Sequence, residues 1–423
     1  MIQIVVIGTG LGGMSVAYEL RHTLGGGAAI TVVGEEDRFS FTPSNPWVAV
    51  GWRKPDQIRL PAAVHLAKKD IAFEGAGAER VEPTENRVLL RDGRHLAYDY
   101  LVIATGPRLA FDEVPGLGPE TGFTQSVCTT PHASAAYDAY LAFLENPGPV
   151  IVGAAAGASC FGPAYEFAMI LDRDLRKRKL RDRVPMTYVT PEPYIGHMGL
   201  GGVGDSKGLM EAELRQRHIQ WITNAKIGEV RDGQMDVVEM DEDGQPRKTR
   251  TLPFDYAMVL PAFTGVDAVR GVEGLGNPRG FILIDRHQRN PAWPNVYALG
   301  VCVAIPPVEA TPVPTGAPKT GFMIESMVTT VARNIQADMA GNPGTVEASW
   351  NAICLADMGD TGVAFVALPQ IPPRNVTWAR VGRWVHVAKV AFEKYFLMKM
   401  KSGNTEPVYE KYVLKLLGIM RTR

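Results

Sequence analysis

The sequence predicts an α/β protein with two Rossmann-like dinucleotide-binding units, of which the second interrupts the first, followed by a C-terminal region of amphipathic helices. A strand, a glycine-rich turn and a helix open the chain over residues 2–24, and a similar but altered series occupies residues 150–167. Two further strand-like runs end at glycines near 106 and 300, on either side of that second series. These observations assign residues 1–110 and 275–330 to the first domain, 111–274 to the second and 331–423 to the C-terminal region.

The first unit carries the full fingerprint of a dinucleotide site. After the apolar strand-like run 2–7, Gly8, Gly10 and Gly13 follow the spacing G-x-G-x-x-G and lead into a run with helical periodicity. Gly8 permits the tight turn, Gly10 lets the backbone approach a pyrophosphate, and Gly13 lets helix and strand pack closely. Glu35 follows the next strand, which ends at Gly34, and can accept a hydrogen bond from a ribose 2′-hydroxyl, which argues against a 2′-phosphate. A Rossmann-like unit without a ligand is the alternative.

Two later strands predict further contacts with the same ligand. One ends at Thr105 and Gly106, and the other ends at Gly300. Because two-domain flavoproteins contact FAD at such strand ends, the chain resembles the disulfide-oxidoreductase-like flavoprotein superfamily over residues 1 to about 330. That resemblance implies FAD as the cofactor. The superfamily usually has Asp after the third glycine, where Val301 stands here, so this contact is expected to be missing or to come from the main chain.

The second fingerprint is broken. Gly153 is present, but Ala155 stands where a bare backbone must approach the pyrophosphate, and Ala158 takes the third position. Glu192, after the next strand, could still meet a ribose. NADH binding is therefore expected to be weakened rather than excluded, and another electron donor has to be considered.

The thiols are the candidate electron donors. Four cysteines are too few for a disulfide framework and too far apart for a zinc knuckle, so no metal site is predicted. Cys160 is expected to begin the helix of the second unit, where the helix dipole lowers the pKa of a thiol. Cys128 lies on the segment between the units, Cys354 lies beyond them, and Cys302 is interpreted as structural. For each thiol, a buried inert side chain is the alternative.

The charge is unevenly distributed. The whole chain of 423 residues has a formal net charge of −1 and therefore shows no sign of a nucleic-acid partner. Residues 374–423 carry a net +8, which leaves −9 on the remainder. A basic C-terminal segment on an acidic body predicts contact with an anionic surface. The chain opens on a strand without a secretory signal, and no apolar run is long enough to span a membrane.

Several stretches together resemble the sulfide:quinone oxidoreductase family. The stretches are FTPSNPWVAVGW (41–52), VCTTPHA (127–133), GASCFGPAYEF (157–167), GHMGLGG (196–202), GVCVAIPP (300–307), APKTGFMIESM (317–327) and WVHVAKVAFEKYF (384–396). Two related groups share the flavin framework and remain alternatives. Type II NADH:quinone oxidoreductases should keep an intact second fingerprint and lack the cysteine pair, and flavocytochrome c sulfide dehydrogenases should carry a secretion signal and lack the basic tail.

The resemblance implies that Cys160 and Cys354 bind sulfide beside the flavin and accumulate sulfane sulfur or polysulfide between them. Cys128 matches a third cysteine, which handles sulfide in some members and tethers the flavin covalently in others. By the same resemblance, electrons then pass through FAD to a membrane quinone. The quinone type, the product chain length and the linkage of FAD are left open by the sequence.

The resemblance also implies proton carriers. His132 and His197 match histidines near the sulfide entrance, and an imidazole can take the proton of hydrogen sulfide. Glu166, on the helix after Cys160, matches a carboxylate that relays protons, and Lys389 matches a lysine beside the quinone. A satisfied structural histidine and a charge on the helix surface are the alternatives.

The remaining implied contacts concern quinone and flavin. Phe392 and Tyr409 match aromatic walls of the quinone site, for which an ordinary apolar helix face is the alternative. Thr320 and Gly321 resemble the turn that approaches the pyrimidine edge of the flavin, for which an ordinary helix cap is the alternative.

Two amphipathic runs near the C-terminus predict a peripheral, monotopic membrane protein, on a membrane face that the sequence leaves open. Core-facing helices or the interface of a homo-oligomer are the alternatives. The first apolar stripe is Val381, Trp384, Val385, Ala388, Phe392, Tyr395 and Met398, with cations at Arg380, Arg383, Lys394, Lys399 and Lys401. The second is Val408, Tyr409, Tyr412, Val413, Leu416, Leu417 and Met420.

Overall fold

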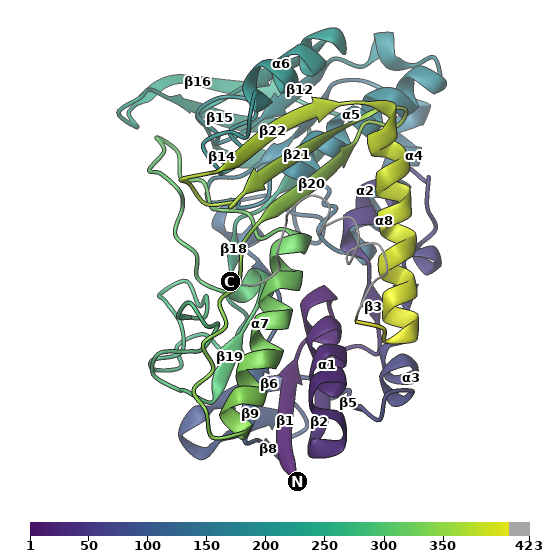
Figure 1. The fold of residues 1–423 in the computed structure, drawn as a ribbon. Coiled ribbons are helices and arrows are strands. Elements are labelled where there is room, and N and C mark those ends of the chain that lie inside the picture. The colour runs from purple at the N-terminus through teal and green to yellow at the C-terminus, as the bar shows by residue number, and fades with distance from the viewer. Residues whose placement is uncertain (406–423) are drawn as a thin grey trace.

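The computed structural model describes residues 1–405 and has the predicted α/β architecture, with two parallel sheets (Figure 1). The first sheet has the strand order β19-β9-β1-β2-β5, and all its pairs are parallel. Its strands are β1 (Ile2–Ile7), β2 (Ala28–Val33), β5 (Ala72–Glu74), β9 (Tyr100–Ile103) and β19 (Val296–Ala298). Since β19 comes after the whole second sheet in the chain, the first unit is interrupted and then resumes.

Helices α1 (Leu11–Leu24) and α7 (Gly321–Met339) pack against each other beside this sheet. The glycines of the first fingerprint explain how α1 can lie so close. A Cβ at Gly13 would stand 1.9 Å from the Gly8 carbonyl oxygen, and a Cβ at Gly8 would stand 2.3 Å from the carbonyl oxygen of Ala104. Any side chain at either position would therefore push the helix or the neighbouring strand away.

The second sheet has the order β13-β12-β11-β17, again all parallel. Its strands are β11 (Val150–Ala154), β12 (Met186–Val189), β13 (Ile219–Ile222) and β17 (Tyr256–Leu260). The accompanying helices are α4 (Thr130–Glu145), α5 (Gly162–Lys177) and α6 (Ser206–Gln216). Helix α5 is buried along most of its length, which fixes the side chains of its first turns in the interior.

Shorter elements connect and decorate the two sheets. Two of these smaller sheets are antiparallel and have three strands each. One consists of β6 (Ala78–Glu82), β7 (Arg87–Leu90) and β8 (His95–Ala97). The other consists of β14 (Ala225–Arg231), β15 (Gln234–Met240) and β16 (Pro246–Pro253). Two-stranded pairs are β3 (Phe39–Ser40) with β4 (Arg59–Leu60), and β10 (Arg108–Leu109) with β18 (Phe263–Thr264). Short helices are α2 (Asn45–Val48) and α3 (Ala62–Ala67).

The C-terminal region contains an antiparallel sheet that the sequence patterns did not predict. It consists of β20 (Ala352–Asp357), β21 (Gly362–Leu368) and β22 (Val376–Val381). Strand β20 packs on α5 and on helix α8 (Arg383–Ser402), which runs down one side of the molecule from this sheet to α3 (Figure 1). The sheet therefore joins the second unit to the C-terminal helix.

The single apolar stripe predicted for α8 is wrong, because its residues divide between two faces. Val385 is buried and Met398 is exposed, although both were assigned to the same stripe. The inward face instead carries three charged side chains, Lys389, Glu393 and Lys399, each of which finds a partner on another element. Spacing along one helix cannot reveal such partners. Tyr409 and the second apolar run lie outside the described residues.

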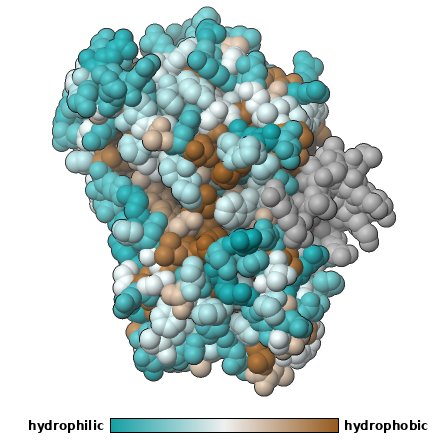
Figure 2. Space-filling view, turned by 60° about the vertical axis from the view of Figure 1, so that its left-hand side comes forward, coloured by the Kyte–Doolittle hydropathy of each residue, from teal (hydrophilic) through white to brown (hydrophobic). Residues whose placement is uncertain are grey.

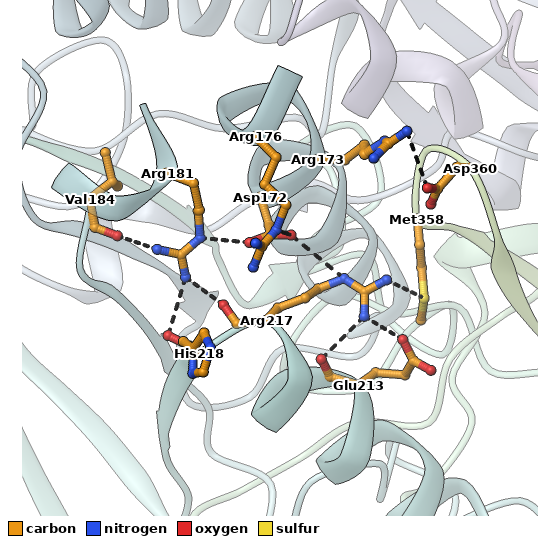
Figure 3. Close-up of polar contacts among 10 residues, drawn as sticks. All are labelled: Asp172, Arg173, Arg176, Arg181, Val184, Glu213, Arg217, His218, Met358 and Asp360. Atoms are coloured by element: carbon orange, nitrogen blue, oxygen red, sulfur yellow. Dashed lines mark hydrogen bonds and ion pairs between the residues drawn. The ribbon is translucent and has the colours of Figure 1, made fainter. Parts of the chain in front are cut away.

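A cluster of ion pairs holds the far end of α5 in place (Figure 3). Asp172 is 2% exposed and binds Arg181 at 2.6 Å, Arg176 at 2.9 Å and Arg217 at 3.8 Å. Arg217, at the end of α6, also lies 3.8 Å from the sulfur of Met358, just beyond β20. The cluster thereby fixes α5 against α6 and the turn after β20.

Replacing Asp172 with Ala should destabilise the fold by about 3 kcal/mol, because the mostly buried Arg181 would lose its countercharge. Urea denaturation of both proteins measures the difference. The exposed neighbour Asp182 provides a control, and Asp182→Asn should change stability by less than about 0.5 kcal/mol. Equal stability of Asp172→Ala and wild type would contradict a role for this cluster.

Candidate active site

The first site-forming region is the turn between β1 and α1. Gly10 caps α1, and a Cβ at Gly10, Gly106 or Gly300 would meet nothing within 4 Å, so open space lies in front of these glycines. The Thr320 hydroxyl caps α7 by accepting from the Met323 N–H at 3.4 Å. Helix N-termini carry partial positive charge, so the glycine turn and the capped start of α7 suit an anionic dinucleotide. The residues present therefore fit the cofactor that the sequence predicts.

Glu35 and Val301 were also predicted to contact the cofactor in this region. Glu35 lies just after β2 with its side chain 62% exposed, and its carboxylate pairs with Arg91 at 2.6 Å. Val301 lies in a short helical turn beside Cys302, whose thiol is buried and donates to the Leu299 carbonyl oxygen at 3.2 Å. The contacts of Glu35, Thr105 and Val301 with a cofactor remain predictions.

The structure brings three of the four cysteines into one neighbourhood. Cys160 lies on the loop before α5, Cys128 just before α4, and Cys354 in the middle of β20. The charge of Cys160 acts on the pKa values of both Cys128 and Cys354, so Cys160 lies within electrostatic range of each of them. All are free and only partly exposed to solvent.

The prediction that a helix dipole lowers the pKa of Cys160 is wrong. Helix α5 begins at Gly162, two residues after the thiol. Desolvation by the surrounding protein raises the pKa of Cys160 to about 11 and that of Cys354 to about 12, although Lys389 opposes both shifts. Removal from water outweighs nearby positive charge here, so these thiols are protonated at neutral pH before a reaction partner arrives.

Sequence reasoning missed Lys319, which precedes the Thr320 cap. Its charge is the largest influence lowering the pKa of Cys160, and desolvation lowers the pKa of Lys319 itself to about 8. Its ammonium group also stands 5.1 Å from the centre of the Phe281 ring. The residue lies within a stretch that carried the family resemblance, but only the folded chain shows that its charge acts on the thiol.

Glu166 and Lys389 form a buried ion pair, in which the lysine Nζ contacts both carboxylate oxygens. Their side chains are only 5% and 6% exposed, so the alternative of a charge on the helix surface is excluded for Glu166. Desolvation raises the pKa of Glu166 to about 7, while Lys389 opposes that shift. A carboxyl group with such a pKa can gain and lose a proton near neutral pH.

Helix α8 also places an aromatic side chain near the glycine-lined cradle. Phe392 contacts Phe41 and Phe396, with ring centres 5.9 and 4.6 Å away. A Cβ at Gly321 would lie 3.8 Å from the Phe392 ring and 3.8 Å from Leu11 at the start of α1. Phe392 therefore stands beside the two helix N-termini that face the cradle.

Each predicted histidine lies beside a glutamate. His197 is buried, accepts from the Gly199 N–H at Nδ1, and therefore donates from Nε2 to Glu309 at 2.7 Å. His132, near the start of α4, lies 3.8 Å from Glu120. Burial lowers the pKa of both imidazoles, and the glutamates oppose that shift. The role of these histidines in taking up the sulfide proton stays a prediction.

The broken second fingerprint is closed by the protein itself. The Gly157 N–H donates to the Pro314 carbonyl oxygen at 2.7 Å, and the Ala155 N–H donates to the Leu260 carbonyl oxygen at 2.8 Å. These backbone donors are therefore not free to cradle a phosphate. Glu192 cannot meet a ribose as predicted, because it is fully buried and its oxygens accept from Tyr165, Thr190 and the Met198 N–H.

The buried Glu192 carboxyl makes stability depend on pH. Desolvation raises its pKa from 4.5 to about 7. The stabilisation of the folded state that is linked to this shift is therefore fully present below pH 4.5 and is lost as pH rises through about 7. The wild type should therefore lose up to about 3 kcal/mol relative to Glu192→Gln across that range. Urea unfolding at several pH values measures this difference. The exposed Glu242→Gln is the control, and a pH-independent difference for Glu192→Gln would contradict the assignment.

Within residues 1–405, no group of histidine, cysteine and carboxylate side chains has the arrangement of a metal site. The site thus consists of a glycine-lined anion cradle, Cys160 within electrostatic range of two further thiols, and a buried lysine–glutamate pair. Such a site is typical of a flavin-dependent thiol oxidoreductase.

Comparison with known proteins defines the class. Residues 2–327 match the family described as pyridine nucleotide-disulphide oxidoreductase, and the chain belongs to this family of flavin enzymes. Within it, the chain belongs to the sulfide-quinone reductases. It is 42% identical over 416 residues to the sulfide-quinone reductase of Aquifex aeolicus (strain VF5), covering 98% of this chain and 94% of that protein.

Solved structures agree. The X-ray structure of the sulfide:quinone oxidoreductase from the hyperthermophilic bacterium Aquifex aeolicus matches with a TM-score of 0.95 and 41% identity, covering 100% of this chain and 97% of that one. NDH2 of Plasmodium falciparum in complex with NADH matches with a TM-score of 0.70 at 13% identity, covering 97% and 98%, which shows the shared fold alone. The predicted family, fold class and enzyme class are thereby confirmed.

Proposed function

We propose that the protein oxidises sulfide at its clustered thiols and passes the electrons through FAD to a membrane quinone. The observation that carries this proposal is the place of Cys160, within electrostatic range of Cys128, Cys354 and the buried Glu166–Lys389 pair. Similarity along the whole chain to a sulfide-quinone reductase supports it. The closed second fingerprint supports a donor other than NADH.

FAD, when bound, accepts two electrons from the sulfur side and delivers them to the quinone side. The open space before the glycines and the capped start of α7 support its place. We propose that it is held by Gly8, Gly10, Gly13, Glu35, Thr105, Gly106, Gly300, Val301, Thr320 and Gly321. The first domain, in this proposal, comprises 1–110 with 275–330, around the second domain.

On the sulfur side, Cys160 and Cys354 act as a pair. Hydrosulfide attacks a bridge between their sulfurs, so one sulfur–sulfur bond breaks, a persulfide forms on one cysteine, and the other is released as a thiolate. Lys319 and Lys389 stabilise negative charge at Cys160, whose pKa desolvation otherwise keeps high. The bridging sulfur accumulates as sulfane sulfur or polysulfide.

On the quinone side, Lys389 delivers a proton to the quinone oxygen and Phe392 provides one wall of the ring site. Lys389 is buried but bound to Glu166, which can return a proton near neutral pH. Tyr409, the other predicted wall, lies outside the described residues.

The outer face of α8 supports contact with a membrane surface. Trp384, Val387 and Met398 are 50%, 66% and 62% exposed, and residues 374–423 carry a net +8. Figure 2, which brings forward the side of the molecule away from α8, shows a separate band of hydrophobic side chains across the middle of that face. No helix among residues 1–405 has the length and hydropathy to cross a membrane. We therefore propose a peripheral protein whose α8 lies against lipid.

Anaerobic mixing tests the electron donor. Sulfide should bleach the flavin absorbance at once, and added quinone should restore it. NADH should leave the absorbance unchanged, because the backbone donors of the second fingerprint are occupied by Pro314 and Leu260. Bleaching by NADH and not by sulfide would show a type II NADH:quinone oxidoreductase instead.

A further inference from the structure

A pocket of about 200 Å³ lies at the far end of α5, where this helix meets α6 and the turn after β20 (Figure 3). Its lining includes three arginines, Arg173, Arg176 and Arg217, together with Asp172, Met358 and Asp360. Neither the thiols nor the glycines of the cofactor cradle contribute to this lining, so the pocket is separate from the candidate active site.

The buried carboxylate of the pocket is already bound by two arginines. Asp172 accepts from Arg181 at Oδ1, with a distance of 2.6 Å, and from Arg176 at Oδ2, with a distance of 2.9 Å. The Nε of Arg217 lies 3.8 Å from Oδ2, which is beyond hydrogen-bond distance. Asp172 therefore leaves the guanidinium group of Arg217 incompletely paired.

Two of the arginines keep donors that lack an oxygen partner. Within residues 1–405, Nη1 of Arg217 binds Glu213, but Nη2 contacts only the sulfur of Met358 at 3.8 Å, and a thioether is a weak acceptor. Arg173 Nε is buried without a hydrogen-bond partner in the same part of the chain, and its Nη2 lies 3.3 Å from the half-exposed Asp360. Because buried donors are normally satisfied, an acceptor from outside the chain is expected here.

The segment beside the pocket is strongly basic. Residues 173–183 contain seven basic and two acidic side chains, which gives a net charge of +5. Four of the cations, Lys177, Arg178, Lys179 and Arg183, are exposed, so the segment attracts anions toward the pocket. Pockets for drug-sized ligands measure about 300–1,000 Å³, and the smaller volume here suits a single anionic group.

We propose that this pocket binds a phosphate group, held by the guanidinium groups of Arg173, Arg176 and Arg217. Guanidinium forks match the oxygens of a phosphate, and charge-assisted hydrogen bonds of this kind are strong. Inorganic phosphate and the headgroup of an anionic lipid both supply this group. Since the lining comes from α5, α6 and the turn after β20, a bound phosphate group holds these elements together and stabilises the fold.

Thermal unfolding and calorimetric titration of the whole protein test the site. Inorganic phosphate, exchanged for chloride at constant ionic strength, should raise the Tm of the wild type. Arg173→Gln should weaken phosphate binding about 10-fold or more, because charge-assisted hydrogen bonds are lost. Arg183→Gln is the matched control, since it removes the same charge from the same segment at an exposed side chain outside the pocket lining.

Asp360→Asn separates a ligand site from a purely structural cluster of ion pairs. The Asp360 carboxylate competes for Arg173 and repels an anion, so the variant should bind phosphate about 3-fold more tightly. Ion pairs with a structural role alone would give no such gain. Unchanged or weaker phosphate binding in Asp360→Asn, or equal phosphate affinities of Arg173→Gln and Arg183→Gln, would overturn the site.

Vesicles distinguish the two sources of the phosphate group. Binding to phosphatidylcholine vesicles is compared with and without phosphatidic acid. Binding that needs phosphatidic acid and falls in Arg173→Gln but not in Arg183→Gln would assign the pocket to a lipid headgroup. Equal vesicle binding of both variants, with weaker phosphate binding in Arg173→Gln, would assign it to free phosphate. A wild type that responds neither to phosphate nor to phosphatidic acid would overturn the proposal.

Discussion

Replacing Cys354 or Cys160 with Ala is expected to reduce sulfide-dependent quinone reduction by about 1000-fold or more. A single remaining thiol cannot form the bridge that hydrosulfide attacks, so no thiolate is released to pass electrons onward. Both variants should remain yellow, because neither residue lies at the glycine turn of the cofactor cradle. Turnover and visible absorbance of the purified variants measure the two effects.

Cys302 provides the control for this prediction. Its buried thiol donates to the Leu299 carbonyl oxygen, and Ser can donate in the same place, so Cys302→Ser should keep most of the activity. If Cys354→Ala kept more than a tenth of wild-type turnover, the sulfur would have to be held by a different pair of thiols. Cys128 would then be the next candidate, since it also lies near Cys160.

Replacing Lys389 with Met is expected to slow flavin reoxidation by quinone about 100-fold, because the quinone oxygen loses its proton donor. Methionine fills similar space, and Glu166 can stay protonated without its partner, since desolvation already raises its pKa to about 7. Bleaching by sulfide should slow much less, because Lys389 influences Cys160 less strongly than Lys319 does. Stopped-flow measurement of each half-reaction gives the comparison.

Lys394→Met is the matched control on the same helix. Lys394 is exposed, whereas Lys389 is buried against Glu166, so loss of Lys394 should leave both half-reactions near the wild-type rates. Equal reoxidation rates for Lys389→Met and the wild type would remove Lys389 from the quinone site.

The first unit and the altered second unit could be predicted because their local patterns are strong. Gly8, Gly10 and Gly13 stand at a fixed spacing between a strand and a helix, and the folded chain uses Gly8 and Gly13 for the close contacts that the spacing predicts. The sheet of residues 352–381 escaped prediction, although Cys354 lies on it. Its strands pair only with each other, although the turn over residues 358–361, with Gly359 inside it and Gly362 after it, is a hairpin signal in the sequence.

In the candidate site, too, the sequence predicted some features and only the folded chain revealed the others. Ala155 alone indicated a weakened nucleotide turn, but only the folded chain shows that Pro314 and Leu260 occupy its backbone donors. Glu192 looked like a ribose ligand from its place after a strand, and burial among hydroxyl groups rules that out. A helix start was expected to acidify Cys160, but desolvation acts in the opposite direction and is stronger.

By itself, the sequence determined the two-unit α/β fold and the glycine turn of the first unit, because each depends on residues near one another in the chain. The sulfide chemistry of the thiols was predicted from the family resemblance. The tertiary structure alone decided which distant charges meet. It buried Lys389 against Glu166 and joined Asp357 to His386. Desolvation and opposite charge act through space, so the proton chemistry of this site depends on contacts between elements hundreds of residues apart.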